Sequence, residues 1–249
     1  MALTSTARGT ATLVTSNTTF VITPASYPAA GSLLVLCLAY DNSGSSGADP
    51  GITSVVDSKG NTWTTRHTTL RDPSTASSGT VLRIWTTRQN AGTLVSADTI
   101  TVTFTNATAA KVGALWEITA ATDFYADYLA TGTGAGGAST APSVTTGTIV
   151  VGDMTIGAVA YEYGEVPATS DTDTTNGSWS TRQNNNIGST TAGNSLCTQT
   201  KVQTTADSTQ VYNPTYTTSS DWAAGWISVR EYANPVPSEG PAYVGGGYY

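Results

Sequence analysis

The side chains that most often take part in catalysis are scarce in this sequence, which contains one histidine and two cysteines in 249 residues. The histidine, His67, lies in the stretch TTRHTT. A hydrolase triad needs a nucleophile, a base and an orienting acid, and no nucleophile motif accompanies His67. We therefore expect His67 at the surface or rim of the protein and predict that the chain is not an enzyme.

Metal sites built from histidine and cysteine are excluded by the same counts. Cys37 and Cys197 lie far apart in the sequence, and we expect two buried, unreactive thiols rather than a disulfide. Calcium prefers oxygen ligands, and acids in such glycine-rich loops usually bond their own backbone instead. We therefore predict turn-forming acids and no bound metal or cofactor. The candidate calcium ligands are Asp41, Asn42 and Asp49 in one loop, and Glu162, Glu165, Asp171 and Asp173 in another.

A pair of carboxylates could hydrolyse a glycosidic bond if both faced one cleft. Glu117 and Glu231 are the pair of interest, because they occupy matching positions in the repeat described below. Repeat mates belong to separate units, so we expect the two carboxylates to lie too far apart to share a substrate. Each is expected instead to accept hydrogen bonds from backbone N–H groups or from an arginine.

Tryptophan rings are further candidates, because an exposed aromatic face can stack on a sugar ring. Trp63 and Trp179 recur at matching repeat positions and are expected in the core. Two other tryptophans share one side of the segment WAAGW and predict an aromatic patch that is either buried at an interface or open to a ligand. The candidate contact residues for a partner or a glycan are Trp222, Trp226, Tyr243, Tyr248 and Tyr249.

The composition around these residues is typical of β-structure. Charged residues make up 11% of the chain, less than half of the ~25% usual in globular domains, and threonine makes up close to a fifth. Threonine favours strands, whereas the strong helix formers glutamate, lysine, glutamine and leucine are scarce. Six tryptophans and twelve tyrosines argue against disorder. The sequence therefore predicts an all-β fold.

The charge pattern argues against nucleic-acid and membrane partners. The formal charge of −7 arises from few acids and fewer bases, and the lysines and arginines are scattered singly. Nucleic-acid binding depends on clustered cations, so we predict no nucleic-acid partner. The first residues lack the pattern of a cleaved signal, and no apolar run reaches the ~18 residues that a membrane span needs.

Four stretches recur in the same order, at offsets of 121, 116, 114 and 114 residues. The order is kept, and the second pair shares a Trp-x-x-Arg pattern, so we predict an internal duplication. The matched pairs are Gly31–Asp41 with Gly152–Glu162, Asn61–Arg66 with Gly177–Arg182, Gly79–Gln89 with Gly193–Gln203, and Ala110–Ile118 with Ala224–Tyr232.

Each unit contains short strand-like segments separated by polar turns, which is typical of a sandwich or a barrel. Leu33–Tyr40 (LLVLCLAY) is apolar on both sides, as expected for a central strand that is covered on both faces. We predict two tandem, internally duplicated antiparallel β-sandwiches of jelly-roll or immunoglobulin-like topology. The expected parts are a first sandwich (1–130), a Gly/Ser/Ala-rich connector (131–143), a second sandwich (144–232) and a Pro/Gly/Tyr-rich tail (233–249).

Four stretches of the first unit together resemble a β-sandwich unit found in virion proteins of tailed bacteriophages and in related phage or bacterial surface proteins. The resemblance covers most of the first unit and, more weakly, the second, where Pro214 interrupts the strand alternation. The stretches are VVDSKGNTWTTR (Val55–Arg66), LRIWTTRQNAGT (Leu82–Thr93), DTITVTFT (Asp98–Thr105) and VGALWEI (Val112–Ile118).

The resemblance implies a non-enzymatic structural protein of a phage virion, assembled in the host bacterial cytoplasm: a head decoration or fibre protein, or a minor tail or tail-tip component. The implied partners are other virion proteins and further copies of the chain, with a contribution to surface adhesion. The alternative is a carbohydrate-binding or adhesin module for a cell-surface glycan, because the same folds carry both functions. A partner should cover Trp222 and Trp226 in the first case, whereas a sugar binder should present open, coplanar rings.

Overall fold

The computed structural model describes residues 3–42, 48–74, 78–188, 192–205 and 208–234, and these residues form antiparallel strands and no helix. The predicted all-β fold of antiparallel sandwiches is therefore confirmed. In chain order the strands are β1 (Thr4–Leu13), β2 (Asn17–Ile22), β3 (Leu33–Asp41), β4 (Ile52–Asp57), β5 (Thr64–Arg71), β6 (Thr80–Arg88), β7 (Ile100–Thr108), β8 (Lys111–Thr119), β9 (Phe124–Thr131), β10 (Ala135–Ser139), β11 (Val144–Thr145), β12 (Met154–Tyr161), β13 (Gln183–Ile187), β14 (Asn194–Val202), β15 (Val211–Tyr212) and β16 (Ser220–Ala233).

The first eight strands form one sandwich of two sheets, with the orders β1-β8-β3-β6-β5 and β2-β7-β4. Strand β1 pairs with β8, β2 with β7 and β3 with β6, so the pairs nest from the outermost strands towards the middle of the unit. Such nesting is produced when one long hairpin rolls up into two sheets, which is the jelly-roll arrangement. The pairing therefore decides between the two topologies that the sequence left open.

The remaining strands repeat this arrangement. Their large sheet has the order β10-β16-β12-β14-β13, with β9 also paired to β16, and β11 pairs with β15. Strands β3 and β12 lie at matching central places, flanked by β6 and β14 on one side and by β8 and β16 on the other. The shared order agrees with the predicted duplication, but strand order is a property of the fold, so a duplication of the sequence stays a prediction.

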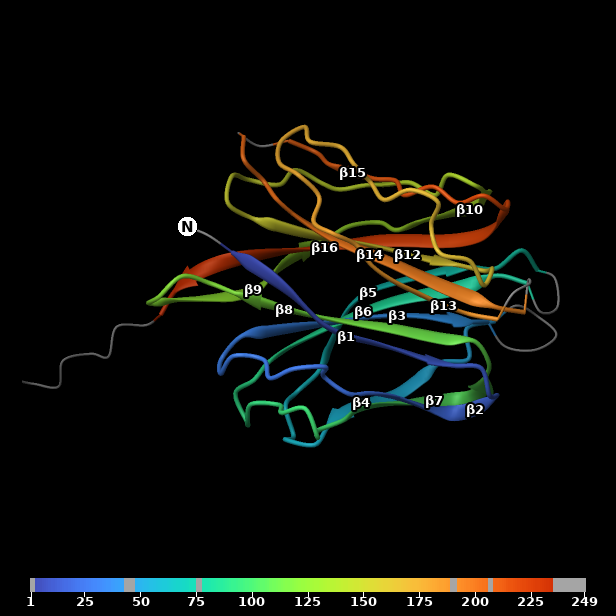
Figure 1. Cartoon of the computed structure of the whole chain (residues 1–249), viewed down its shortest axis with the longest axis horizontal. Helices are drawn as coiled ribbons and strands as arrows, with labels where there is room; N and C mark the ends of the chain where they lie inside the picture. The colour runs from blue at the N-terminus through green and yellow to red at the C-terminus, as the bar shows by residue number, and fades with distance from the viewer. Residues whose placement is uncertain (1–2, 43–47, 75–77, 189–191, 206–207, 235–249) are drawn as a thin grey trace, which may run out of the picture.

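The two sandwiches stack through their large sheets and form four layers (Figure 1). The contacts between them are reciprocal: β5 lies against β16 as β13 lies against β8, and β6 lies against β16 as β14 lies against β8. Matching surfaces of the two units therefore face one another, as they do in a two-fold symmetric dimer. We call the joint between the two large sheets the seam.

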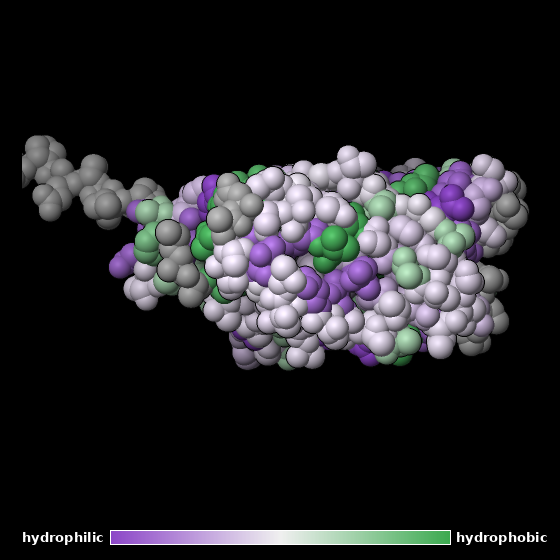
Figure 2. All heavy atoms as spheres, turned by 90° about the horizontal axis from the view of Figure 1, so that it is seen from above, coloured by the Kyte–Doolittle hydropathy of each residue, from purple (hydrophilic) through white to green (hydrophobic). Residues whose placement is uncertain are grey.

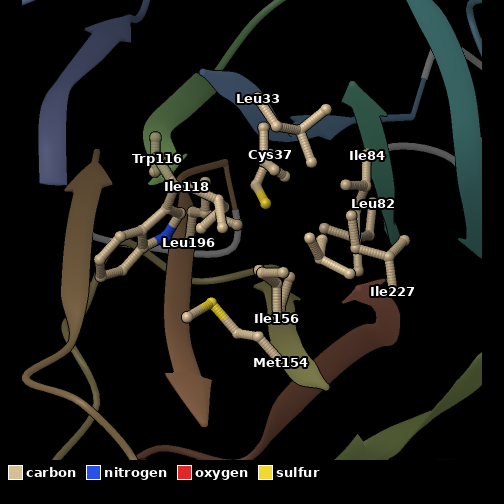
Figure 3. Packing of buried hydrophobic residues seen from close by; sticks show 14 of the residues in the cluster. Leu33, Cys37, Leu82, Ile84, Trp116, Ile118, Met154, Ile156, Leu196 and Ile227 are labelled. Carbon is tan, nitrogen blue, oxygen red and sulfur yellow. The ribbon is translucent and has the colours of Figure 1, made fainter. Parts of the chain in front are cut away.

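Three apolar clusters fill the spaces between the four layers, and strand β3 contributes to two of them. Leu34 and Leu36 point into the first sandwich, whereas Leu33 and Cys37 point across the seam. The seam cluster takes buried residues from both sandwiches, and Cys37 faces residues of the second one, such as Ile156 (Figure 3). The prediction of a central strand covered on both faces is confirmed.

The segment 131–143, expected to be a connector, carries strand β10, and β9, which precedes it, also pairs with β16. Close packing explains its many glycines. A Cβ atom on Gly132 would lie 2.7 Å from the Trp226 ring, and one on Gly137 would lie 3.0 Å from the Trp222 ring. Glycine therefore lets this part of the chain pass directly over two tryptophans.

The outer surface matches the composition. The face shown in Figure 2 is dominated by residues of intermediate hydropathy, with strongly hydrophilic and strongly hydrophobic residues scattered among them. Such a surface is hydrated mainly by hydroxyl and amide groups rather than by charges. Residues 235–249 of the expected tail lie outside the described residues.

Candidate functional site

The seam brings titratable side chains of the two sandwiches together. Along it, edge strand β5 of the first sandwich lies against β16 of the second. The Nε atom of Arg71 donates to Oδ1 of Asp221 at 2.8 Å, and the Thr69 hydroxyl donates to the carbonyl of Ala224 at 3.2 Å. His67 lies on the same strand, so three side chains of β5 meet the second sandwich.

His67 is buried in the seam, with 6% of its surface exposed. Its Nδ1 lies 2.9 Å from the Thr131 hydroxyl and its Nε2 lies 2.7 Å from the Thr69 hydroxyl. Burial lowers the pKa of the imidazole to about 4, so it is neutral near pH 7. The expected surface or rim position is wrong, because the face of β5 that carries His67 is covered by a strand of the other sandwich.

Two glycines make room for this histidine and its neighbour. A Cβ atom on Gly225 would lie 2.1 Å from Nε2 of His67, and one on Gly134 would lie 1.7 Å from Oγ1 of Thr69. Gln183, the repeat counterpart of His67, is also buried in the seam, where its Nε2 donates to the carbonyl of Leu115 at 3.0 Å. Both repeat positions therefore serve contact between the sandwiches.

Four of the six acids considered as calcium ligands already accept hydrogen bonds from N–H groups of the protein. Three of them, Asp49, Asp171 and Asp173, each accept the N–H group two residues further along the chain, which confirms their turn-forming roles, whereas Glu165 accepts N–H groups of a distant loop. The described residues contain no group of three or more His, Cys, Asp or Glu side chains placed to hold a metal ion. The acids and their donors are Asp49 with the Gly51 N–H and Arg83, Glu165 with the N–H groups of Thr217 and Thr218, Asp171 with the N–H groups of Asp173 and Asn213, and Asp173 with the Thr175 N–H and Lys201.

The two remaining acids, Asp41 and Glu162, lie near enough to each other at the seam for the charge of Asp41 to act on Glu162. Asp41 ends β3, and Glu162 directly follows β12. Glu162 is 2% exposed, and its Oε2 accepts the Gly79 N–H at 2.5 Å. Among the described residues, Oε1 of Glu162 and Oδ1 of Asp41 are buried and have no hydrogen-bond partner. These two oxygens are therefore places where the protein leaves a carboxyl group unsatisfied.

Burial raises the pKa of both carboxyl groups to about 7. The negative charges of Asp221 and Asp41 raise the pKa of Glu162 further, while the N–H of Gly79 opposes this effect. The charge of Asp221 is itself paired with Arg71. The arrangement can hold a proton near neutral pH, because each lone carboxylate would otherwise be charged in a poorly hydrated place.

Repeat counterparts also meet directly beside these acids. The side-chain amide of Asn194 donates to the Thr80 hydroxyl at 2.9 Å, and these two residues match in the sequence alignment. Asp41 and Glu162 are likewise the last residues of the first matched pair of stretches. At this end of the seam, equivalent residues of the two sandwiches therefore lie next to one another.

Glu117 and Glu231 have the structural roles expected for them. Glu117 accepts hydrogen bonds from the guanidinium of Arg8 and from the backbone N–H of Ala29. Glu231 accepts the backbone N–H of Ala121 at 2.7 Å. Both carboxylates therefore hold chain segments in place near the ends of β8 and β16.

The two tryptophans expected to form a patch are buried by the chain itself. Trp222 is 9% exposed and Trp226 is 3% exposed, and both belong to the apolar cluster inside the second sandwich. The Nε1 atom of Trp222 donates to the hydroxyl of Ser139 at 3.0 Å. Neither ring is open to a sugar. The other three contact candidates, Tyr243, Tyr248 and Tyr249, lie outside the described residues.

The two thiols are free and buried, as predicted. Cys37 lies in the seam cluster and Cys197 in the cluster of the second sandwich. Burial raises the pKa of both thiols to about 12. The reactive thiolate form is therefore absent near neutral pH.

Two hollows in the surface lie away from His67, Asp41 and Glu162. One of 340 Å³ between β1 and β14 is lined by serine, threonine and apolar side chains and has no titratable group in its lining. Another of 260 Å³ lies beside Phe124 and Tyr125, near the start of β9. Neither of these two hollows is lined by an acid, a histidine, a lysine, an arginine or a cysteine.

The fold and the seam together define an all-β protein made of two stacked jelly rolls. Buried titratable side chains, His67, Asp41 and Glu162, lie where the two jelly rolls meet. Comparison with known proteins found no matching family model and no matching curated protein. A search of the described residues for a helix long and apolar enough to cross a membrane found none.

Proposed function

We propose that this chain is a non-enzymatic structural protein of a tailed-phage virion, in which the two jelly rolls act as one rigid block. The proposed place is a head decoration or fibre, or a minor tail or tail-tip component, assembled in the host bacterial cytoplasm. Its partners would be other virion proteins and copies of itself.

The apolar cluster in the seam is the observation that carries this proposal. It joins both large sheets through buried side chains such as Leu33, Val35, Ile156 and Leu196. Domains that move during catalysis or ligand capture usually meet through smaller, more polar interfaces. A continuous core between two jelly rolls instead favours a unit of fixed shape, and the resemblance of the first unit to virion proteins agrees with a structural role.

The test is the composition of intact particles. Particles of the encoding phage would be purified on a density gradient and analysed by peptide mass spectrometry, with immunogold labelling by antibodies raised against the recombinant chain. We expect peptides from both jelly rolls in a fixed ratio to the major capsid protein, and labelling confined to one part of the particle. Purified particles that lack the chain would overturn the proposal.

The glycan-binding alternative depended on an open face at Trp222 and Trp226. Because the chain itself covers both rings, they offer neither the open platform that a sugar binder needs nor the partner contact expected there for a virion protein. We therefore do not propose glycan binding, and the virion proposal does not depend on these two tryptophans. A glycan array probed with the intact chain supplies the check, and we expect no binding above that of a Trp222→Ala variant.

A further inference from the structure

We propose that Asp41 and Glu162 form a proton-binding pair that makes the seam sensitive to pH. With both carboxyl groups protonated, this end of the seam is closed. When their protons pass to water, negative charge remains in a buried place and the seam loosens there. The inference concerns the seam alone and stands whether or not the chain belongs to a virion.

The geometry of the pair carries the proposal. The two carboxyl groups come from different sandwiches, at the ends of the central strands β3 and β12. Oδ1 of Asp41 and Oε1 of Glu162 are both buried and unpartnered among the described residues. A buried carboxylate oxygen without a donor is costly, and the protein removes that cost most simply by keeping a proton there.

The groups that face the pair do not neutralise it. Strand β16 contributes Asp221, a third acid whose charge acts on Glu162 more strongly than that of Asp41 and whose carboxyl group lies within hydrogen-bonding reach of Glu162. Strand β5 contributes Arg71, whose guanidinium is paired with Asp221. Strands β6 and β14 contribute the uncharged Thr80 and Asn194, which bond to each other. The neighbouring charge acting on Glu162 is therefore negative, and it disfavours a second ionisation.

A cation could also satisfy the two oxygens, but the arrangement favours a proton. Calcium takes six to eight oxygen ligands, whereas the described residues place no group of three acids, histidines or cysteines around one point. A proton bound to a carboxyl group needs no further ligand.

The pKa values of the two acids give the direction and the window of the effect. Both are raised by burial to about 7, above the ~4 of an exposed carboxyl group. The closed seam therefore holds protons that the open seam releases. The stabilisation is complete below about pH 4 and is lost as the pH rises to about 7.

Hydrogen exchange of the intact chain tests the proposal, because the Gly79 N–H is donated to Glu162. After correction for the intrinsic exchange rate, we expect the opening constant at Gly79 to rise about tenfold per pH unit for each proton released between pH 5 and 7, and then to level off. The side-chain amide of the Glu162→Gln variant cannot ionise, so one fewer proton is released on opening. The opening constant at Gly79 should therefore rise less steeply in this variant, by a factor of about ten per pH unit. His67 acts on the same seam in both proteins, so the comparison removes its contribution.

The matched control is Glu165→Gln, the same substitution at a loop acid whose carboxylate is held by donors from Thr217 and Thr218. It should leave the slope unchanged. A slope in Glu162→Gln equal to that of the wild type would overturn the proposal. So would protection that calcium restores at pH 8 in the wild type alone, because a cation would then occupy the pair.

Carboxyl ¹³C shifts of the wild-type protein provide a second measurement that needs no variant. Two carboxyl resonances that titrate near pH 7, and that Asp41→Asn and Glu162→Gln assign, would support the proposal. If every carboxyl group of the folded protein titrates below about pH 5, the pair holds no proton near neutrality and the proposal fails.

Discussion

The imidazole of His67 lies directly against the backbone of Gly225, where a Cβ atom would come within 2.1 Å of Nε2. The two residues belong to different sandwiches, on β5 and β16. The sheets can approach this closely only because residue 225 has no side chain. The contact makes the packing of the two jelly rolls depend on one pair of residues, and it can be tested directly.

Replacing Gly225 with alanine should destabilise the protein. The added methyl group must displace the imidazole or separate the sheets, and such overpacking costs about 1–3 kcal/mol. Urea unfolding measures the loss. Gly147→Ala is the matched control, because its added Cβ would meet no atom closer than 3.9 Å, and it should change stability by less than about 0.5 kcal/mol. Equal effects of the two substitutions would contradict the role of close packing.

Acid should destabilise the folded chain through His67. Its pKa is lowered by burial to about 4, whereas an unfolded histidine titrates near ~6.5, so the unfolded state binds the proton first. The stabilisation from the neutral ring is present above about pH 6.5 and falls as the pH drops towards 4, by roughly 3 kcal/mol in total.

The difference in unfolding free energy between wild type and His67→Gln measures this effect at pH 7 and pH 4.5. Asp41 and Glu162 contribute in the opposite direction, but they do so equally in both proteins. The advantage of the wild type should be smaller at the lower pH. An advantage that does not change with pH would show that the ring is already charged or exposed in the folded state.

The seam cluster should make both jelly rolls unfold together. Ile84 lies in the first sandwich and Ile156 in the second, and both are buried in the shared cluster. Changing either to alanine should cost about 2–5 kcal/mol and lower the temperature of one common transition in calorimetry. Val21→Ala, at a side chain that is 47% exposed, is the control and should have little effect. Two separate transitions, each moved by one substitution, would refute the shared core.

The ion pair of Arg8 and Glu117 should stabilise the first sandwich. The Glu117 side chain is 1% exposed, so Arg8→Ala leaves a buried carboxylate without its main charge partner, at a cost of about 3 kcal/mol. Lys59→Ala breaks a pair with Asp98 in which the lysine is 36% exposed, and should cost less than about 1 kcal/mol. Chemical denaturation of the two variants compares these costs, and a larger loss for Lys59→Ala would contradict the assignment.

Much of the fold could be predicted because the strands carry their own patterns. The alternation in Asp98–Thr105 and the continuous apolar run in Leu33–Tyr40 match β7 and β3. The segment 131–143 was harder, because glycine is abundant both in flexible connectors and where a chain passes close to large side chains. Only the positions of Trp222 and Trp226 beneath it distinguish the two cases.

The candidate site was less accessible to sequence reasoning. The sequence indicates that Asp41 and Glu162 are both loop acids, but it places them in separate sites in separate units. The alignment of Gly31–Asp41 with Gly152–Glu162 was the signal that could have joined them, because equivalent residues meet where two similar units pack through matching surfaces. His67 gave no such signal, since its own strand looks like an exposed edge.

The sequence by itself determined the class of the protein: an all-β chain, poor in charge, with two successive sets of strands and buried thiols. These properties follow from composition and from the two-residue period of a strand, which are local. The tertiary structure alone decided that the two large sheets share a core, that His67 is buried against Gly225, and that Asp41 lies near enough to Glu162 for its charge to act there. Those contacts join residues far apart in the chain, and the pattern within one strand does not specify which distant surface will cover it.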